Sequence, residues 1–363
     1  MGKDILSQRQ LLVLLFAAML APLAGGLPGQ LAALAGEGAW AAPLLALPLV
    51  LLWCWMIKAL FSGQGKGQNL MQLCQNILGK WLGGAVILLY LIWGLFLLMV
   101  NTRLYGERLL SAGYQKVPLT LLLALPLALL LWMSLGKLSA FLRAVEIFYL
   151  LLSVALGAVL VFALVQIKVE YVFPLWWEDL PRVLSGVVPV LGIVSYGIFG
   201  TCFLDQLSPG RRGAHFAAMR WGGAFCLVLA LLQLAAVGQF GGALCAGMEE
   251  PFLQLVAGIG VQGAFQRLEG VSAALWILAD LALLGLLAFA CKKMGKTLLP
   301  AAWREEWLPV AILLIALVGA LNLFPDAFSA QKISQAVLPF GNLFAALFLP
   351  ALLSIVGKLR KKL

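Results

Sequence analysis

The sequence has few charged residues for its length. Only 11% of the 363 residues are charged, and 63% are hydrophobic, whereas a soluble domain has about 25% charged and about 45–50% apolar residues. A soluble fold with this composition would leave large apolar patches in contact with water. The shortage of charge therefore excludes an ordinary soluble protein and indicates a membrane protein.

The groups that most enzymes and metal sites need are also scarce. His215 is the only histidine, and the six cysteines form no Cys-x-x-Cys pair. We find no Ser/His/Asp set, no group of histidines and no phosphate-binding loop. We therefore predict no enzyme, no catalytic residue, no metal site, no disulfide framework and no cofactor beyond a coupling proton or sodium ion.

Long apolar runs are abundant, and about 20 apolar residues are enough for one helix to cross a bilayer. The runs are continuous and lack the alternation of a membrane β-barrel strand, so we predict an all-α integral membrane domain over residues 1–363. We expect about ten spans, at residues 10–34, 40–62, 81–104, 118–136, 143–166, 181–206, 214–238, 264–290, 307–324 and 334–356. Between spans we expect a short amphipathic helix over 69–79 on the cytoplasmic side and an outer re-entrant or surface helix over 251–262.

The basic residues set the expected orientation. The net charge is +10, but Lys and Arg fall mostly in short connections between spans, which favours a topology signal over nucleic-acid binding. With a cytoplasmic N-terminus, 18 of the 25 basic residues lie inside and 7 outside. Both termini are then cytoplasmic, which requires an even number of spans. We expect a multi-pass inner-membrane protein.

Glycine and proline cluster in the first and sixth runs. Both residues favour a break in a helix, and unwound backbone is tolerated within a membrane only where it is buried or lines a cavity. Close helix packing is the alternative explanation for such glycines. Because the two runs are equivalent positions in two sets of five, we predict repeats over 8–166 and 180–357 with broken helices one and six. The clusters are Pro22, Gly25, Gly26, Pro28 and Gly29, and Gly186, Pro189, Gly192, Gly197 and Gly200.

Several short motifs, in order along the chain, resemble the spore-germination permease family, the B-type subunits of bacterial germinant receptors. The resemblance implies membership of the amino acid–polyamine–organocation superfamily and a LeuT-like fold. It also implies a location in a bacterial inner (cytoplasmic or spore) membrane and partnership with A-type and C-type receptor subunits. The motifs are Leu6-Ser7-Gln8-Arg9-Gln10-Leu11, Gly26-Leu27-Pro28 with Ala39-Trp40, Gly79-Lys80-Trp81-Leu82-Gly83, Arg143-Ala144-Val145-Glu146, and Gln266-Arg267-Leu268-Glu269 with Ala274-Leu275-Trp276.

A ligand site is expected where the broken helices meet. Half-helix N-termini offer amides to a carboxylate, and Asp280, near the middle of the eighth run, is an acid in a costly position. Asp280 is either a cation or ammonium partner or an acid packed against a neighbouring helix. The expected substrate-binding residues are Gly25, Gly26, Leu27, Tyr90, Asn101, Gly192, Ser195, Tyr196, Gly197 and Asp280.

Two further pairs of opposite charge are interpreted as structural. Arg103 and Glu107, and likewise Arg143 and Glu146, are spaced so that they can pair along one helix face.

Two functions fit this pattern. The first is a germinant-receptor permease subunit that binds a small germinant, an amino acid, in a mid-membrane cavity and signals to its partners. The second is a secondary amino acid transporter coupled to an ion. A structural scaffold, the third hypothesis, predicts continuous first and sixth helices and no polar cavity.

Overall fold

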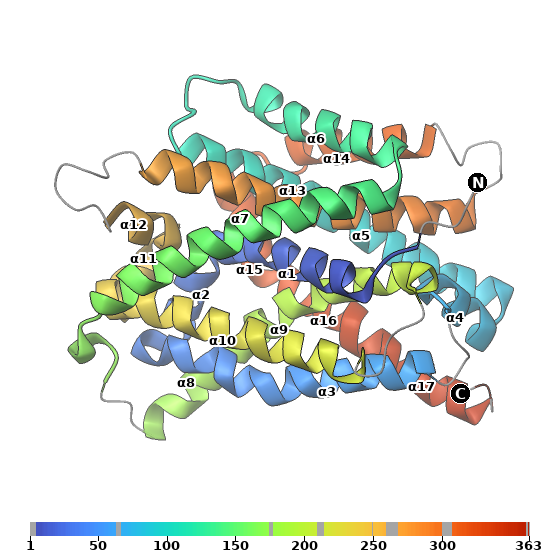
Figure 1. The fold of residues 1–363 in the computed structure, drawn as a ribbon, viewed down its shortest axis with the longest axis horizontal. Coiled ribbons are helices and arrows are strands. Elements are labelled where there is room, and N and C mark those ends of the chain that lie inside the picture. The colour runs from blue at the N-terminus through green and yellow to red at the C-terminus, as the bar shows by residue number, and fades with distance from the viewer. Residues whose placement is uncertain are drawn as a thin grey trace.

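The computed structural model of this chain describes residues 5–62, 67–173, 177–208, 214–248, 250–258, 268–299, 307–360 and 362. Within these residues every named element is a helix, and the extended pairing is confined to an isolated parallel bridge between Leu6 and Leu207. Most of the long helices run roughly along the longest axis of the molecule (Figure 1). The all-helical class predicted from the sequence is therefore correct.

The first apolar run is interrupted at two glycines. Helix α1 (Gln8–Ala24) starts with a capping box in which Ser7 and Gln10 satisfy each other's backbone amides. It ends before Gly25 and Gly26, and the chain resumes as α2 (Leu27–Ala35). Pro28 lies in the first turn of α2, where its missing amide costs nothing. A 3₁₀ turn, η1 (Gly36–Ala41), then leads to α3 (Ala42–Ser62).

A short amphipathic helix, expected over residues 69–79, is present as α4 (Leu70–Leu78). Asn69 accepts from the Gln72 amide, and Gln72 accepts from the Asn69 amide in return. The apolar face of α4 packs against α5 (Lys80–Ser111), and Gly79, with φ of +88°, makes the turn between them. The side of the membrane on which α4 lies stays a prediction.

The sixth apolar run differs from the expectation of an unwound stretch. It consists of α8 (Leu180–Ser185), α9 (Val187–Val194) and η4 (Ser195–Gln206). The helix continues past the glycines but changes from α to 3₁₀ at Ser195, and 3₁₀ runs longer than 3–4 residues are uncommon. The Ser195 hydroxyl donates to the Leu191 carbonyl (2.7 Å) and so satisfies backbone at the transition. This interruption is thus a change of helix type.

The remaining helices complete the bundle, and α14 and α15 are bent by 111° from each other. A re-entrant or surface helix is expected over 251–262; residues 251–258 form α12, and residues 259–262 lie outside the described part. The elements are α6 (Leu119–Leu135), α7 (Leu138–Val165), η2 (Val169–Tyr171), η3 (Trp177–Asp179), α10 (Ala214–Phe240), α11 (Gly242–Gly247), α12 (Pro251–Gly258), α13 (Leu268–Leu298), α14 (Trp307–Asn322), α15 (Ala327–Ala336), α16 (Leu338–Leu343), the π-helical η6 (Phe344–Phe348) and α17 (Leu349–Leu359).

By length and composition, six helical stretches among the described residues can cross a membrane, or seven if α14 and α15 form one bent span. The structure thus supports a multi-pass membrane protein. Helices lie within each of the ten predicted ranges, but α1 and α6 are shorter than a full span. The ten-span topology and its two repeats stay predictions.

The centre of the bundle is formed by α13, which packs against α1, α5 and α7. All six cysteines are buried within the bundle, and none forms a disulfide. The chain starts and ends at the same end of the bundle (Figure 1). There the Leu6 amide donates to the Gln206 carbonyl at the end of η4, and Arg360 after α17 donates to the Ile77 carbonyl of α4.

Candidate functional site

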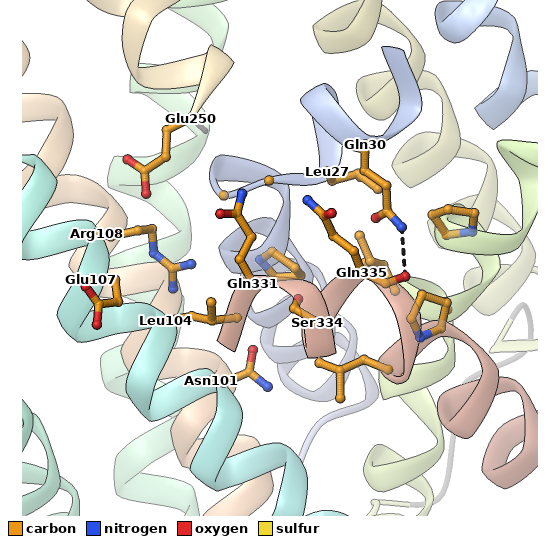
Figure 2. Close-up of a pocket in the computed structure, with 18 of the residues that line it drawn as sticks. Leu27, Gln30, Asn101, Leu104, Glu107, Arg108, Glu250, Gln331, Ser334 and Gln335 are labelled. Atoms are coloured by element: carbon orange, nitrogen blue, oxygen red, sulfur yellow. Dashed lines mark hydrogen bonds between the residues drawn. The ribbon is translucent and has the colours of Figure 1, made fainter. Parts of the chain in front are cut away.

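A cavity of about 110 Å³ lies beside the interruption between α1 and α2. Its walls come from the interruption, the last turns of α5, the junction of α9 with η4, and the helices α15 and α16. Figure 2 shows the polar side chains of these elements converging on this space. One water needs about 10–15 Å³ by this kind of measure, so the cavity has room for several waters or one small solute.

The interruption brings backbone and a cation together. Gly26 caps the N-terminus of α2 and offers no side chain to the first-turn amides. A side chain at Gly25 would start only 3.1 Å from Nη1 of Arg108, so the glycine makes room for the guanidinium beside the helix N-terminus. Both features favour an anionic group at this wall. The expected residues Gly25, Gly26 and Leu27 all line the cavity.

Arg108 is held in place by Asp280. Its Nε donates to Oδ2 of Asp280 (3.3 Å), and its Nη2 forms an ion pair with the other carboxylate oxygen. The side chains are only 11% and 6% exposed, respectively. Asp280 itself lines a smaller adjoining cavity with Tyr105 and Trp276, and Arg108 borders both cavities. Asp280, expected to contact the ligand, therefore does not line the main cavity itself. It contacts Arg108, which does.

Besides Arg108, helix α5 contributes an ion-paired carboxylate and an amide side chain to the cavity wall. Arg103 Nε lies 2.7 Å from Glu107 Oε1, four residues along α5, which is the pairing that the spacing predicts. Glu107 also lines the cavity. The sequence had suggested only a structural role for this pair. Asn101 lines the cavity as well and donates to the Leu97 carbonyl (2.7 Å) and the Tyr196 hydroxyl (3.0 Å).

The junction of α9 with η4 is fixed by a second network. Asn342 donates to the Gly192 carbonyl (2.9 Å) and accepts from Trp93 Nε1 (3.0 Å). Gly192 touches α16, since a Cβ there would lie 2.7 Å from the Pro339 Cα. Gly192 and Tyr196, both expected at the site, therefore line a wall whose hydrogen bonds are made within the protein.

Besides Asp280, three expected binding residues lie outside the lining of the main cavity. The Tyr90 hydroxyl donates to the Ala345 carbonyl (2.7 Å) in the core. Ser195 satisfies Leu191, and Gly197 packs against the Trp53 ring, which a Cβ would approach to 2.7 Å. These groups support the scaffold, because each is used by a contact within the protein.

The expected pairing of Arg143 with Glu146 is wrong. Arg143 is exposed on α7, and Glu146 accepts a hydrogen bond from Gln10 of α1 (3.2 Å). No ion pair joins the two among the described residues. The spacing of three residues permits the pair, but Gln10 on the neighbouring helix α1 occupies the carboxylate instead.

A family model described as a spore germination protein matches residues 5–327. This chain belongs to the spore-germination permease family. No curated protein matches the sequence significantly.

Within this spore-germination permease, the family match includes the interruption, Arg108 and Asp280, and it ends at the first residue of α15. Beyond it lie cavity residues that the sequence reasoning missed, namely Gln331, Ser334 and Gln335 of α15. Their spacing of three and four residues was the available signal, because it puts them on one helix face. Arg108, Gln30 and Glu250 were missed as well, and all three line the cavity.

Segments distant in the sequence are in contact at the permease's cavity. Gln30 of α2 donates to the Gln335 carbonyl of α15 (3.0 Å), drawn as a dashed line in Figure 2. The two ion pairs at the cavity, Arg108 with Asp280 and Arg103 with Glu107, each cancel one positive with one negative charge. Glu250 adds a further carboxylate to the lining, so the site offers separated charges of both signs.

Proposed function

We propose that this chain is the permease subunit of a germinant receptor and binds a small zwitterionic amino acid in the cavity at the first helix interruption. The observation that carries the proposal is the meeting of the uncapped N-terminus of α2 with the guanidinium of Arg108 at the cavity wall. A helix N-terminus and an arginine are two established ways of holding a carboxylate.

The ligand's two charges have partners at opposite sides of the cavity. The carboxylate lies against the amides after Gly26 and the exposed edge of Arg108. The ammonium lies towards Glu107 and the carbonyl oxygen of Asn101. Because both ion pairs at the wall are internally neutral, a ligand of zero net charge adds no unpaired charge to the site. A ligand with net charge would, and unpaired buried charge is costly.

Binding at this site then signals to partner subunits of the A and C types. Ten spans in a LeuT-like 5+5 arrangement position the cavity at mid-membrane. The interruption at Gly25 and Gly26 and the change of helix type at Ser195 support this arrangement, because they occur at equivalent places in the two predicted repeats.

The test is binding and uptake of a radiolabelled amino-acid panel by the purified protein in proteoliposomes. We expect saturable binding with little net uptake. The double variant Arg108→Gln/Asp280→Asn removes both buried charges and should weaken binding roughly 10- to 100-fold, since a hydrogen bond to a charged group contributes about 1.5–3 kcal/mol. Arg143→Gln, which changes an exposed arginine, is the matched control. Full affinity in the double variant, or no binding by any panel member, would overturn the proposal.

An ion-coupled amino acid carrier is the second candidate. It is favoured by Asp280, a buried acid that is joined to the cavity through Arg108. The same proteoliposomes distinguish the two functions. Concentrative uptake driven by a proton or sodium gradient would identify a carrier, and loss of that uptake in Asp280→Asn would assign coupling to this residue.

A further inference from the structure

One face of α15 forms a polar wall of the cavity. Gln331, Ser334 and Gln335 follow the i, i+3, i+4 spacing of a single helix face, and all three line the cavity. In Figure 2 the carboxamides of Gln331 and Gln335 reach from α15 into the space between Arg108 and Gln30.

These three side chains differ from the two asparagines of the cavity. Asn101 and Asn342 are both engaged in hydrogen bonds within the protein. The side chains of Gln331, Ser334 and Gln335 make no hydrogen bond to any described residue, and only the backbone carbonyl of Gln335 is used, by Gln30. They are half-buried. Their hydrogen-bonding capacity is therefore directed at what occupies the cavity.

The chemistry of this wall restricts the ligand. A carboxamide both donates and accepts, and a hydroxyl does the same. An apolar ligand side chain would displace water from two carboxamides without replacing its hydrogen bonds, and unmade bonds of partly buried groups are unfavourable. A charged ligand side chain would find no opposite charge among Gln331, Ser334 and Gln335.

We propose that α15 is the specificity wall of the site and that the ligand is an amino acid with a neutral, hydrogen-bonding side chain, of which a carboxamide is the best match. The inference rests on the proposed function, because the zwitterionic groups at the interruption direct the ligand's side chain towards α15. Gln331 and Gln335 bind the side chain, and Ser334 adds a third donor and acceptor between them.

The experiment measures binding of labelled L-asparagine and L-alanine to the full-length protein in proteoliposomes. Unlabelled L-glutamine, L-serine, L-valine, L-aspartate and L-lysine serve as competitors. We expect L-asparagine or L-glutamine to bind about tenfold more tightly than L-alanine or L-valine, as two ordinary hydrogen bonds allow. L-Aspartate and L-lysine should compete least.

The variant Gln331→Leu/Gln335→Leu should lose this preference while binding L-alanine at least as well as the wild type does. Lys332→Leu, at an exposed position on the same helix, is the control and should keep the preference. Retained L-alanine binding shows that the double variant is folded.

The outcomes separate the two levels of the proposal. Equal binding of L-asparagine and L-alanine by the wild type, or a preference that survives in the double variant, overturns the specificity wall and leaves the zwitterion site standing. If the double variant loses L-alanine as well, α15 is not a side-chain reader, and the inference is also overturned. Failure of every amino acid to bind the wild type overturns the proposed function together with this inference.

Discussion

The guanidinium of Arg108 and the carboxylate of Asp280 are both nearly buried, and each is compensated by the other. Removing one member of such a pair leaves an uncompensated charge and typically costs about 3–5 kcal/mol, whereas replacing both costs much less. The pair also joins α5 to α13, the helix at the centre of the bundle.

We therefore predict that Arg108→Gln alone lowers the thermal unfolding midpoint more than Arg108→Gln/Asp280→Asn does. Thermal unfolding of the purified variants in detergent checks this. The expected coupling between the two substitutions is a few kcal/mol. Additive effects of the single substitutions would show that the pair contributes little to the stability of the fold.

Individual residues show where sequence reasoning succeeds and where it stops. Gly25 and Gly26 could be assigned to the site because a helix break has a compositional signature. Tyr90 and Ser195 could not be excluded from the site. The sequence does not tell whether a hydroxyl bonds the backbone or faces a cavity. Gln331 was missed because it lies between two expected spans, and Gln335 because it falls at the start of the last expected span.

At the scale of the element, α4 and α5 are joined through a glycine. A Cβ at Gly83 would lie 2.7 Å from the Cys74 carbonyl oxygen and 2.8 Å from the Gln75 Cα, whereas a Cβ at Gly84 would have nothing within 4 Å. The first glycine lets the two helices touch through their backbones, and the second is an ordinary helix position.

We predict opposite effects for alanine at these neighbouring positions. Gly83→Ala forces α4 away from α5 and should destabilise the protein by about 1–3 kcal/mol. Gly84→Ala should be neutral or stabilise by up to about 1 kcal/mol, because glycine is a poor helix former. Thermal unfolding of the two variants side by side measures both. A similar loss of stability at both positions would contradict the close contact.

Elements with a strong apolar or capping pattern were predicted well. The helix after Asn69 was expected and is present, because its capping residues and its apolar face are both local features. The sixth run was expected to unwind and instead becomes a long 3₁₀ helix. That outcome depends on hydroxyls that bond carbonyls three or four residues earlier, and glycine content alone does not reveal it.

For the whole molecule, the bias of basic residues and the position of both chain ends at one end of the bundle (Figure 1) support an even number of spans. We predict that both ends face the cytoplasm. A fluorescent protein fused to the C-terminus should fluoresce. A phosphatase that folds only outside the cytoplasm should be active when fused after Gly113 and inactive when fused after Gly136. The reverse pattern would invert the topology.

All six native thiols are enclosed by the packing of the bundle. A polar maleimide that stays in solvent should find almost nothing to react with on the folded wild-type protein. The chain is thus already close to a cysteine-free background, and a single cysteine introduced on α15 or at a loop can be labelled without removing the natural ones. A spectroscopic probe of ligand-dependent movement can therefore be attached to a variant that carries a single substitution.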